Sequence, residues 1–280
     1  MYATKHLDWL SVTFEDLRSA LGIIPDSDWH NVGSGHHGYR TALQDAVSGA
    51  RIETDSAVAS MGAHLTMSGQ TLYEVRTQYP DGDNSLVQAI RANDGSVSRV
   101  DLALNIHQGE LTVQDFFSAY KSGDLKSNAR RVYYVEGISD ARSGDTLYLG
   151  SPKSDRQCRI YNKAAEQAIV DNESWLRLEL ALRDLRAKNG VNAMGSNTCA
   201  AVISAHVEDM LGWDNREFND ALLDVPVALH PIKRRRPNTE QWLLDQCAPA
   251  LAKVYSVHPD FMVEFMTKFR QSLDKLYKRG

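Results

Sequence analysis

Three short segments of this chain alternate leucine-rich and polar side chains with a period of two residues. They lie at residues 99–106, 159–163 and 175–183. Successive side chains of a β-strand point to opposite faces of the sheet, so each segment predicts a strand with one apolar and one polar face. If the three strands are neighbours, their apolar faces build one core and their polar side chains gather on the other face. This pattern favours an antiparallel sheet that is covered on one side.

The predicted polar face carries a tyrosine, carboxylates and cations. Tyr161 lies between Arg159 and Lys163. The two carboxylates are Asp101 and Glu179. Each is followed two positions later on the same strand by a small residue, Ala103 or Ala181. A phenol has an ordinary pKa of about 10 and is a poor nucleophile until cations or a metal ion favour the phenolate. The alternative interpretation is a solvated sheet face, on which alternating charge is common.

A divalent ion would complete this chemistry. We expect Asp101 and Glu179 to hold it, while Arg159 and Lys163 flank the nucleophile Tyr161. Hard oxygen ligands suit Mg²⁺ or Mn²⁺ better than zinc. The ion and the cations would also neutralise the charge that develops on a phosphodiester under attack. Periodicity alone favours the solvated face; the grouping of these side chains is what makes attack on a phosphodiester by a tyrosine the second interpretation.

The rest of the chain predicts an α+β fold: a large, mostly antiparallel sheet with helices packed on one side, plus a helical C-terminal region. Expected strands are residues 6–14, 38–43, 51–54, 64–68, 71–77 and 146–150, the last forming a hairpin with residues 156–163. Expected helices are residues 85–93, a helix over residues 114–120 capped by Thr112, and most of residues 187–223 and 238–278. We expect a catalytic domain at residues 1–186. Residues 187–280 are expected to be mainly helical, either as part of that domain or as a small accessory or DNA-binding region.

The charge balance restricts how this chain can meet a polyanion. Its 280 residues contain 31 Lys and Arg against 36 Asp and Glu, a net charge of −5, so no chain-wide positive field exists. The densest positive patch is Lys233, Arg234, Arg235 and Arg236, which suits duplex phosphates, although charge runs are often solvated linkers. Arg99, Arg177 and Arg183 on the predicted polar face are further candidate DNA contacts.

Cysteine usage and hydropathy indicate the compartment. The three cysteines, Cys158, Cys199 and Cys247, are scattered and have no partner at disulfide-framework or zinc spacing. No apolar run approaches the roughly 18 to 20 residues that a membrane span needs. We therefore expect a cytoplasmic protein with no membrane partner.

Five segments together resemble a known family. They are HLDWLSVTF at residues 6–14, MSGQTLYEV at 67–75, RVDLALN at 99–105, TLYLGSPKSDRQCRIYNKAAE at 146–166 and LRLELALR at 176–183. In this order they resemble the replication initiation factor family, the rolling-circle initiators of plasmids and phages that are related to conjugative relaxases. The resemblance spans roughly residues 5–186.

The resemblance implies a function for the polar face. Family members nick one strand at a double-strand origin through a tyrosine, stay linked to the 5′ phosphate and free a 3′ hydroxyl. Tyr161 matches the nucleophile, and Asp101 and Glu179 match acidic positions near the metal. The implied partners are origin DNA with its single-stranded nick region, host helicase and polymerase, and a possible second copy of the chain. One departure is Asn105, which stands where members often have a second acid.

Several alternatives stay open at this point. Tyr148 is a rival nucleophile, although it lacks flanking cations, and Glu53, Glu74 and His107 are further candidate metal ligands. A conjugative relaxase acting at a transfer origin needs the same nick. A DNA-binding repressor or copy-control protein of the same fold would have lost cleavage.

Overall fold

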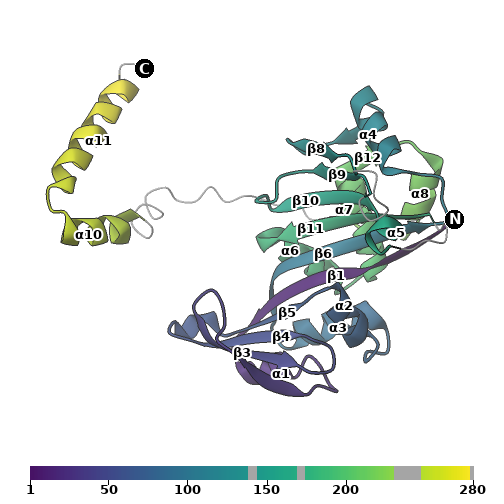
Figure 1. Ribbon diagram of the computed structural model, residues 1–280, viewed down its shortest axis with the longest axis horizontal. Helices are drawn as coiled ribbons and strands as arrows, with labels where there is room; N and C mark the ends of the chain where they lie inside the picture. Colours follow the sequence, from purple (N-terminus) through teal and green to yellow (C-terminus); the bar gives the residue numbers. More distant parts are fainter. Residues whose placement is uncertain (138–143, 169–173, 230–246, 278–280) are drawn as a thin grey trace. The chain divides into compact units, whose positions relative to one another are not determined.

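The computed structural model describes residues 1–137, 144–168, 174–229 and 247–277. Its main element is a ten-stranded sheet in the order β2-β3-β4-β5-β1-β6-β11-β10-β9-β8, in which all neighbouring strands are antiparallel (Figure 1). The strands are β1 (Tyr2–Phe14), β2 (Trp29–Gly33), β3 (Tyr39–Asp45), β4 (Arg51–Ser56), β5 (Ala63–Met67), β6 (Ser96–His107), β8 (Val132–Val135), β9 (Thr146–Leu149), β10 (Arg156–Asn162) and β11 (Trp175–Arg183). A small second sheet pairs β7 (Leu125–Ser127) with β12 (Leu211–Trp213). The large antiparallel sheet confirms the predicted fold class.

The helices are short, as is common when they serve to cover a sheet. They are α1 (Leu17–Leu21), α2 (Gly69–Arg76), α3 (Gly82–Ala92), α4 (Val113–Ser122), α5 (Lys163–Glu166), α6 (Asp184–Ala193), α7 (Cys199–Met210), α8 (Arg216–Leu222), α10 (Ala248–Val257) and α11 (Phe261–Tyr277), with a 3-10 turn at Ala59–Met61. Thr112 caps α4 through a capping box with Asp115, as its sequence position predicts.

The first strand lies in the middle of the sheet. β1 pairs with β6 along most of its length, but with β5 only over Leu10–Phe14. Its register against β6 shifts between Leu7 and Trp9, which places Asp8 in a bulge. β1 therefore joins the two halves of the sheet. Its first residues pair with β6 along one edge, and no described strand pairs with their other edge.

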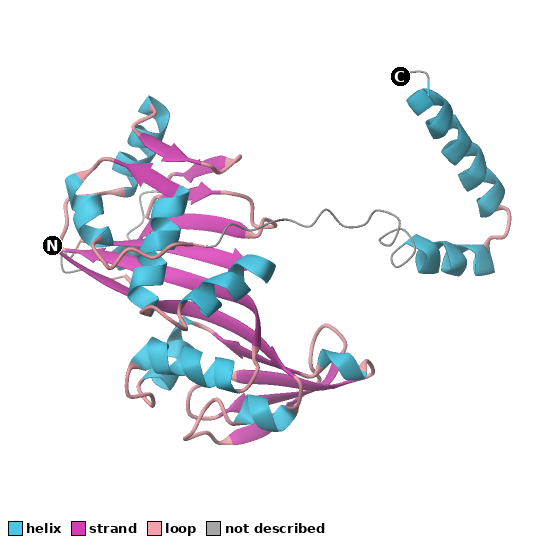
Figure 2. Ribbon diagram, turned by 180° about the vertical axis from the view of Figure 1, so that it is seen from behind, coloured by secondary structure: helices cyan, strands magenta, loops and turns pink. Residues whose placement is uncertain are grey.

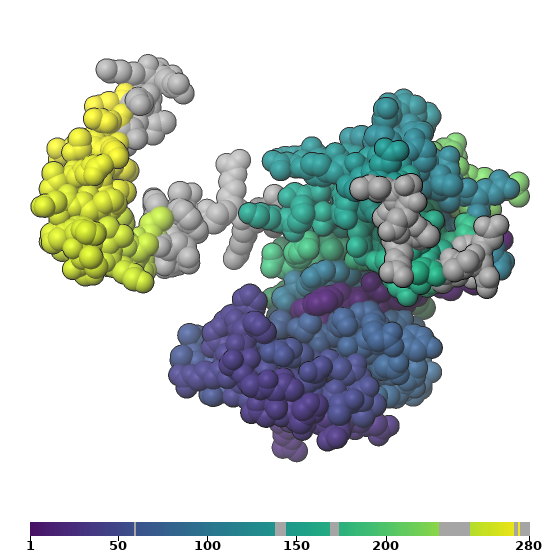
Figure 3. All heavy atoms as spheres, in the orientation of Figure 1, coloured from purple at the N-terminus to yellow at the C-terminus, as the bar shows by residue number. Residues whose placement is uncertain are grey.

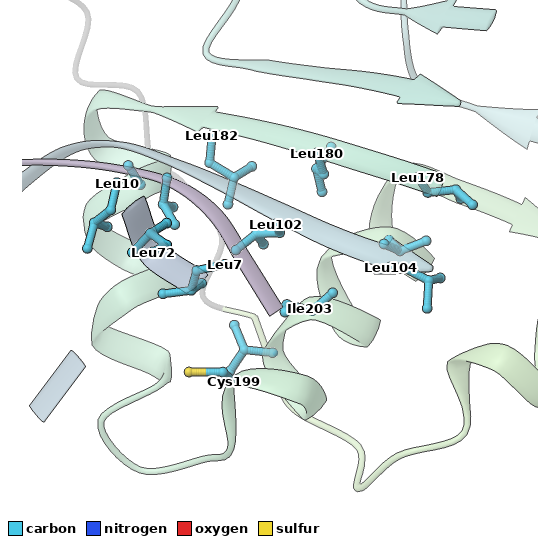
Figure 4. Packing of buried hydrophobic residues seen from close by; sticks show 14 of the residues in the cluster. Leu7, Leu10, Leu72, Leu102, Leu104, Leu178, Leu180, Leu182, Cys199 and Ile203 are labelled. Atoms are coloured by element: carbon cyan, nitrogen blue, oxygen red, sulfur yellow. The ribbon is translucent and has the colours of Figure 1, made fainter. Parts of the chain in front are cut away.

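The predicted leucine faces form the core. Leu102, Leu178 and Leu180 of β6 and β11 belong to this core, and Figure 4 shows Cys199 and Ile203 of α7 on the same side of the sheet, near Leu7 of β1. Helices α6 and α7 pack against β6, and α2 packs against β1, so the view in Figure 2 shows helices in front of the sheet. The other face of β1, β6, β11 and β10, with α5 at one end, is turned to the viewer in Figure 1. We call this the open face.

Two predictions about individual elements are corrected. Residues 71–77, expected as a strand, belong mostly to helix α2, because Thr71, Leu72 and Val75 become buried along one helical face after Ser68. Residues 187–223, expected as largely helical, also contain strand β12, which pairs with β7 and packs Trp213 against Phe116.

Helices α6, α7 and α8 share a compact unit with the sheet, which is one of the two possibilities that the sequence left open for residues 187–280. Two compact units form, Met1–Pro231 and Ile232–Gly280. Helices α6 and α7 contribute buried residues to the core of the sheet, so they belong to the first unit. The second unit contains α10 and α11, which follow each other in the chain, and along α11 Phe261, Phe265 and Phe269 stack at helical spacing. The basic cluster at residues 233–236 lies outside the described residues.

Candidate active site

Cross-strand register brings the predicted polar residues into rows on the open face. One row contains Thr4, Asn105, Arg177 and Tyr161 from β1, β6, β11 and β10. The neighbouring row contains His6, Ala103, Glu179, Arg159 and Tyr148, the last from β9. Residues directly opposite each other on antiparallel strands are about 4.5 to 5.5 Å apart, so their side chains interact. The assumed adjacency of the three strands is therefore correct.

Tyr161 makes a hydrogen bond and two cation–π contacts. Its side chain is 4% exposed, and its hydroxyl donates to Glu179 Oε2 at 3.2 Å. The Arg159 guanidinium lies 4.1 Å from the centre of the tyrosine ring and donates to the same Glu179 oxygen at 2.7 Å. Lys163 Nζ lies 5.7 Å from the ring centre. Arg159 Nε is buried without a hydrogen-bond partner among the described residues, so a donor is free beside the phenol.

The electrostatic balance keeps the Tyr161 phenol protonated. Burial raises the pKa of Tyr161 well above its ordinary value, and the negative charge of Glu179 raises it further. Arg159, which the sequence predicted to lower this pKa, and Arg177, which it did not, both lower it, but they do not outweigh burial. Because the cations alone do not produce a phenolate here, Tyr161 would need a base to take its proton in order to act as a nucleophile.

A buried amide holds the neighbouring cation in place. Asn105 Oδ1 accepts from Arg177 Nε at 2.7 Å and from Trp175 Nε1 at 2.8 Å, while Asn105 Nδ2 donates to Thr4 Oγ1 at 3.1 Å. Arg177 also pairs with Asp8 at 3.0 Å. The arginine opposite Tyr161 is therefore fixed from two sides. A carboxylate at position 105 could not make the donation to Thr4.

Asp8 and His6 complete this cluster. Burial alone would raise the pKa of Asp8, but the hydrogen bond from His6 and the charge of Arg177 outweigh it, so the pKa lies below its ordinary value. The sequence argument does not single out either residue. Their signal is the alternation in HLDWL, which places His6 on the polar face, whereas the bulge that brings Asp8 to Arg177 has no signature in the sequence.

The two predicted metal ligands are each bound to an arginine. Asp101 accepts two hydrogen bonds from Arg99, at 2.9 and 2.5 Å, and Glu179 accepts from Arg159. Within the ranges that the structure describes, no three His, Cys, Asp or Glu side chains gather as a metal site requires. The donor atoms have the type that Mg²⁺ or Mn²⁺ takes, but an ion bound by Asp101 or Glu179 would compete with the arginine that each carboxylate already holds. These ligand assignments stay predictions.

The other predicted residues have local partners. Lys163 forms an ion pair with Glu166 on α5, and Arg183 donates to the backbone oxygen of Ser154 at 3.2 Å. Arg99 lies 4.6 Å over the Trp9 ring. DNA contacts by Arg99, Arg177 and Arg183 are therefore still predictions.

The alternative candidates lie in different surroundings. Tyr148 is opposite Arg159 on β9, so it is close to the cluster but one strand farther from Glu179. Glu53 belongs to a separate cluster, where it bonds His36 at 2.8 Å. Glu74 lies on helix α2 and not on a strand, and it accepts from Gln70.

The sequence matches a known family over most of the region that carries this site. Residues 95–269, more than half of the chain, match the replication initiation factor family. The chain belongs to the replication initiation factor family. The resemblance noted in the sequence is thus confirmed, and the matched region includes Tyr161, Glu179 and Asp101.

Two individual proteins are similar to this chain. The putative DNA relaxase NicK of Bacillus subtilis (strain 168) is 25% identical over 186 residues, which cover 57% of this chain and 53% of that protein. The chain thus matches about half the length of this relative. A solved structure of a rolling circle replication initiator protein from Geobacillus stearothermophilus superimposes with a TM-score of 0.66 at 21% identity, covering 81% of this chain and 92% of that one. That similarity shows a shared fold.

Proposed function

We propose that this member of the replication initiation factor family nicks and rejoins one strand of origin DNA through Tyr161. The observation that carries the proposal is the hydroxyl of Tyr161, which donates to Glu179 while Arg159 and Arg177 flank it. A nucleophile, a base within hydrogen-bond reach and cations for a developing negative charge are the parts that this chemistry needs. Its substrates are a double-strand origin and the single-stranded nick region within it.

The proposed step balances as follows. The Tyr161 oxygen forms a bond to the scissile phosphorus, and the bond from phosphorus to the 3′ oxygen breaks. The phenolic proton passes to Glu179 and from there to the departing 3′ oxygen. The products are a 5′-phosphotyrosine and a free 3′ hydroxyl that a host polymerase can extend, and rejoining is the same step in reverse. Arg159 Nε, which has no partner among the described residues, supplies a hydrogen bond to a phosphate oxygen.

Trapping the covalent adduct tests this proposal. Labelled supercoiled and single-stranded origin DNA is incubated with the protein and Mg²⁺, and the products are separated on a denaturing gel. We expect a labelled protein adduct that disappears in Tyr161→Phe, while Tyr148→Phe, the matched control on the adjacent strand, still forms it. Mass spectrometry that places the nucleotide on Tyr148 or on another residue would contradict the assignment.

A requirement for Mg²⁺ or Mn²⁺ belongs to the same proposal. Three ion pairs lie around Tyr161: Arg159–Glu179, Lys163–Glu166 and Arg177–Asp8. Because these cations are already matched by carboxylates, a bound phosphodiester adds a negative charge that no fixed group of the cluster neutralises. This charge balance supports a cation, although the structure does not show where it binds.

The similarity to a putative DNA relaxase supports a second candidate. Such a protein makes the same nick at a transfer origin, so residue chemistry does not separate the two functions. Nicking assays on cloned replication and transfer origins do: we expect cleavage at a replication origin, and cleavage only at a transfer origin would favour the relaxase. An oligomeric state, host helicase contacts and a cytoplasmic location stay predictions. No described helix is long and apolar enough to cross a membrane.

A further inference from the structure

An aromatic ladder crosses the open face one row away from Tyr161. Tyr2, His107 and Trp175 occupy equivalent positions on β1, β6 and β11. The Tyr2 and His107 rings stack with centres 4.6 Å apart and planes 8° apart, and the His107 and Trp175 rings stack at 5.1 Å and 30°. The Arg177 guanidinium lies 5.6 Å from the Trp175 ring centre, at the end of the ladder nearest Tyr161.

The ladder ends in an uncovered ring. Tyr2 is 50% exposed. β5 pairs with β1 only from Leu10 onward, so no strand follows β1 at the level of Tyr2, and among the described residues no other ring stacks on Tyr2. Trp175, by contrast, is fixed by its hydrogen bond to Asn105. One end of the stack is therefore anchored, and the other presents an aromatic face.

We propose that Tyr2 stacks against a nucleobase of the single-stranded DNA next to the nick, which extends the ladder by one ring. The inference rests on the proposed nicking function. Proteins that bind single strands use aromatic side chains as stacking platforms, because every base has a π-face. Three strand spacings and two residues separate Tyr2 from Tyr161, so their backbones are roughly 16 Å apart. A strand whose phosphate lies at Tyr161 can therefore reach Tyr2 within a few nucleotides.

The charges nearby favour this occupant over an apolar partner. Arg177 belongs to the row that contains Tyr161 and also contacts the ladder through the ring of Trp175. Lys163 follows Asn162, and Asn162 pairs with Leu176, the neighbour of Trp175 in the chain, so Lys163 lies near the ladder as well. A DNA backbone that runs from Tyr161 to Tyr2 therefore passes fixed cations. Stacking on Tyr2 selects single strands, because the bases of a duplex are already stacked on each other.

Binding measurements on variants of the full chain test the proposal. The probe is a fluorescein-labelled single-stranded DNA of mixed sequence, roughly 20 nucleotides long and thus longer than the site of a single-strand-binding fold. Tyr161→Phe is used as the parent so that cleavage does not occur. We expect Tyr2→Ala and Tyr2→Leu to weaken binding about 5- to 100-fold, while Tyr2→Phe binds as the parent does. Duplex DNA of the same sequence should lose much less affinity.

The control is Tyr73→Ala, which removes a tyrosine that is 61% exposed on helix α2. Circular dichroism and thermal unfolding establish that each variant is folded. Equal affinities of the parent and a folded Tyr2→Ala for the single strand would overturn the stacking proposal, as would an equal loss in Tyr73→Ala. If the wild-type chain neither binds single-stranded origin DNA nor forms an adduct, the proposed function itself fails, which is a separate result.

Discussion

At the scale of single residues, Tyr161 is held in its neutral form by its surroundings. Burial and Glu179 raise its pKa more than Arg159 and Arg177 lower it. A protonated phenol is a poor nucleophile, so any reaction of Tyr161 with a phosphate requires removal of its proton. The hydrogen bond from Tyr161 to Glu179 gives that proton an acceptor within reach.

Replacing Glu179 tests the base directly. Glu179→Gln keeps the size of the side chain but removes the carboxylate that accepts the Tyr161 proton, so we expect the nicking rate to fall about 10²- to 10⁴-fold. DNA affinity should change little. Single-turnover nicking on a denaturing gel gives the rate. Glu166→Gln, which removes the nearby carboxylate paired with Lys163, is the control, and an equal loss in both variants would assign Glu179 a general electrostatic role.

Removal of divalent ions tests the charge argument. Because the three cations near Tyr161 are already paired, we expect excess EDTA to abolish nicking and added Mg²⁺ or Mn²⁺ to restore it. Asp101→Asn should raise the Mg²⁺ concentration needed for half-maximal nicking. Asp55→Asn, at an exposed position, serves as the control. Cleavage that continues at full rate in EDTA would mean that the arginines suffice.

At the scale of elements, a cap predicted from sequence contributes to stability. Thr112 accepts a hydrogen bond from the Asp115 backbone nitrogen at 3.3 Å, and Asp115 accepts from the Thr112 backbone nitrogen at 2.9 Å. Thr112→Ala removes one bond of this box, so we expect the free energy of unfolding to fall by about 1 kcal/mol. Urea denaturation measures it. Thr112→Ser keeps the oxygen and should match the wild type, and a loss as large as that of alanine would contradict the capping explanation.

The packing of α7 against its neighbours predicts acid sensitivity. His206 is buried, and neither ring nitrogen has a hydrogen-bond partner among the described residues. Burial, with the nearby charge of Arg156, lowers the pKa of His206 to about 4. Its ordinary pKa is about 6.5, so between these values the unfolded chain binds a proton that the folded chain excludes. Stability is therefore lost as the pH falls through this window.

Replacing His206 tests this prediction. From pH 6.5 to pH 5 the histidine should remove about 1 to 2 kcal/mol from the free energy of unfolding. Chemical denaturation across this range should show a flatter pH dependence in His206→Met than in the wild type. His30→Met, at an exposed position, should leave the slope unchanged. A slope that is unchanged in His206→Met would assign the acid sensitivity to other groups.

The sequence correctly predicted the strands in which one period of apolar residues dominates. The leucines at alternate positions in β6 and β11 predicted strands, faces and core, because burial of a sheet face requires that period. Residues 71–77 were misassigned because a short segment with few apolar residues fits either period, and only packing of Leu72 and Val75 under β1 decides it.

The same reasoning predicted only part of the candidate active site. Alternation placed Tyr161, Arg159 and Glu179 on one face, and their contacts follow from register. The partners of Arg177 could not be predicted, because Asp8 reaches it through a bulge in a strand more than 160 residues away in sequence. Asp101 accepts hydrogen bonds from Arg99, which lies two residues away on the same face of the strand. Arg99 therefore competes with the metal ion that we expected Asp101 to bind.

At the scale of the whole molecule, the basic cluster lies at the start of the second compact unit. Lys233 to Arg236 are outside the described residues, and we propose that they contact duplex phosphates. Replacing all four with serine should weaken binding to any duplex without moving the nick, because phosphate contacts carry no sequence information. If two to four contacts are lost, the slope of log K against log salt should decrease by about 0.9 per contact.

Salt titrations of the wild type and the four-serine variant give these slopes. The control is replacement of the exposed pair Lys268 and Arg270 on α11 with serine. Identical affinities and slopes for the wild type and the four-serine variant would make the cluster a linker. A relocated nick would mean that the cluster reads bases.

The central place of β1 in the sheet has a consequence for synthesis of the protein. A ribosome must deliver His107 before Tyr2 has a partner, and it must deliver residues 63–67 before the other half of β1 is paired. Until then Leu7, Leu10 and Val12, which are fully buried in the finished fold, are exposed on a strand with two open edges. Such a strand pairs readily with other chains. We therefore expect aggregation of nascent chains during overexpression to begin at β1.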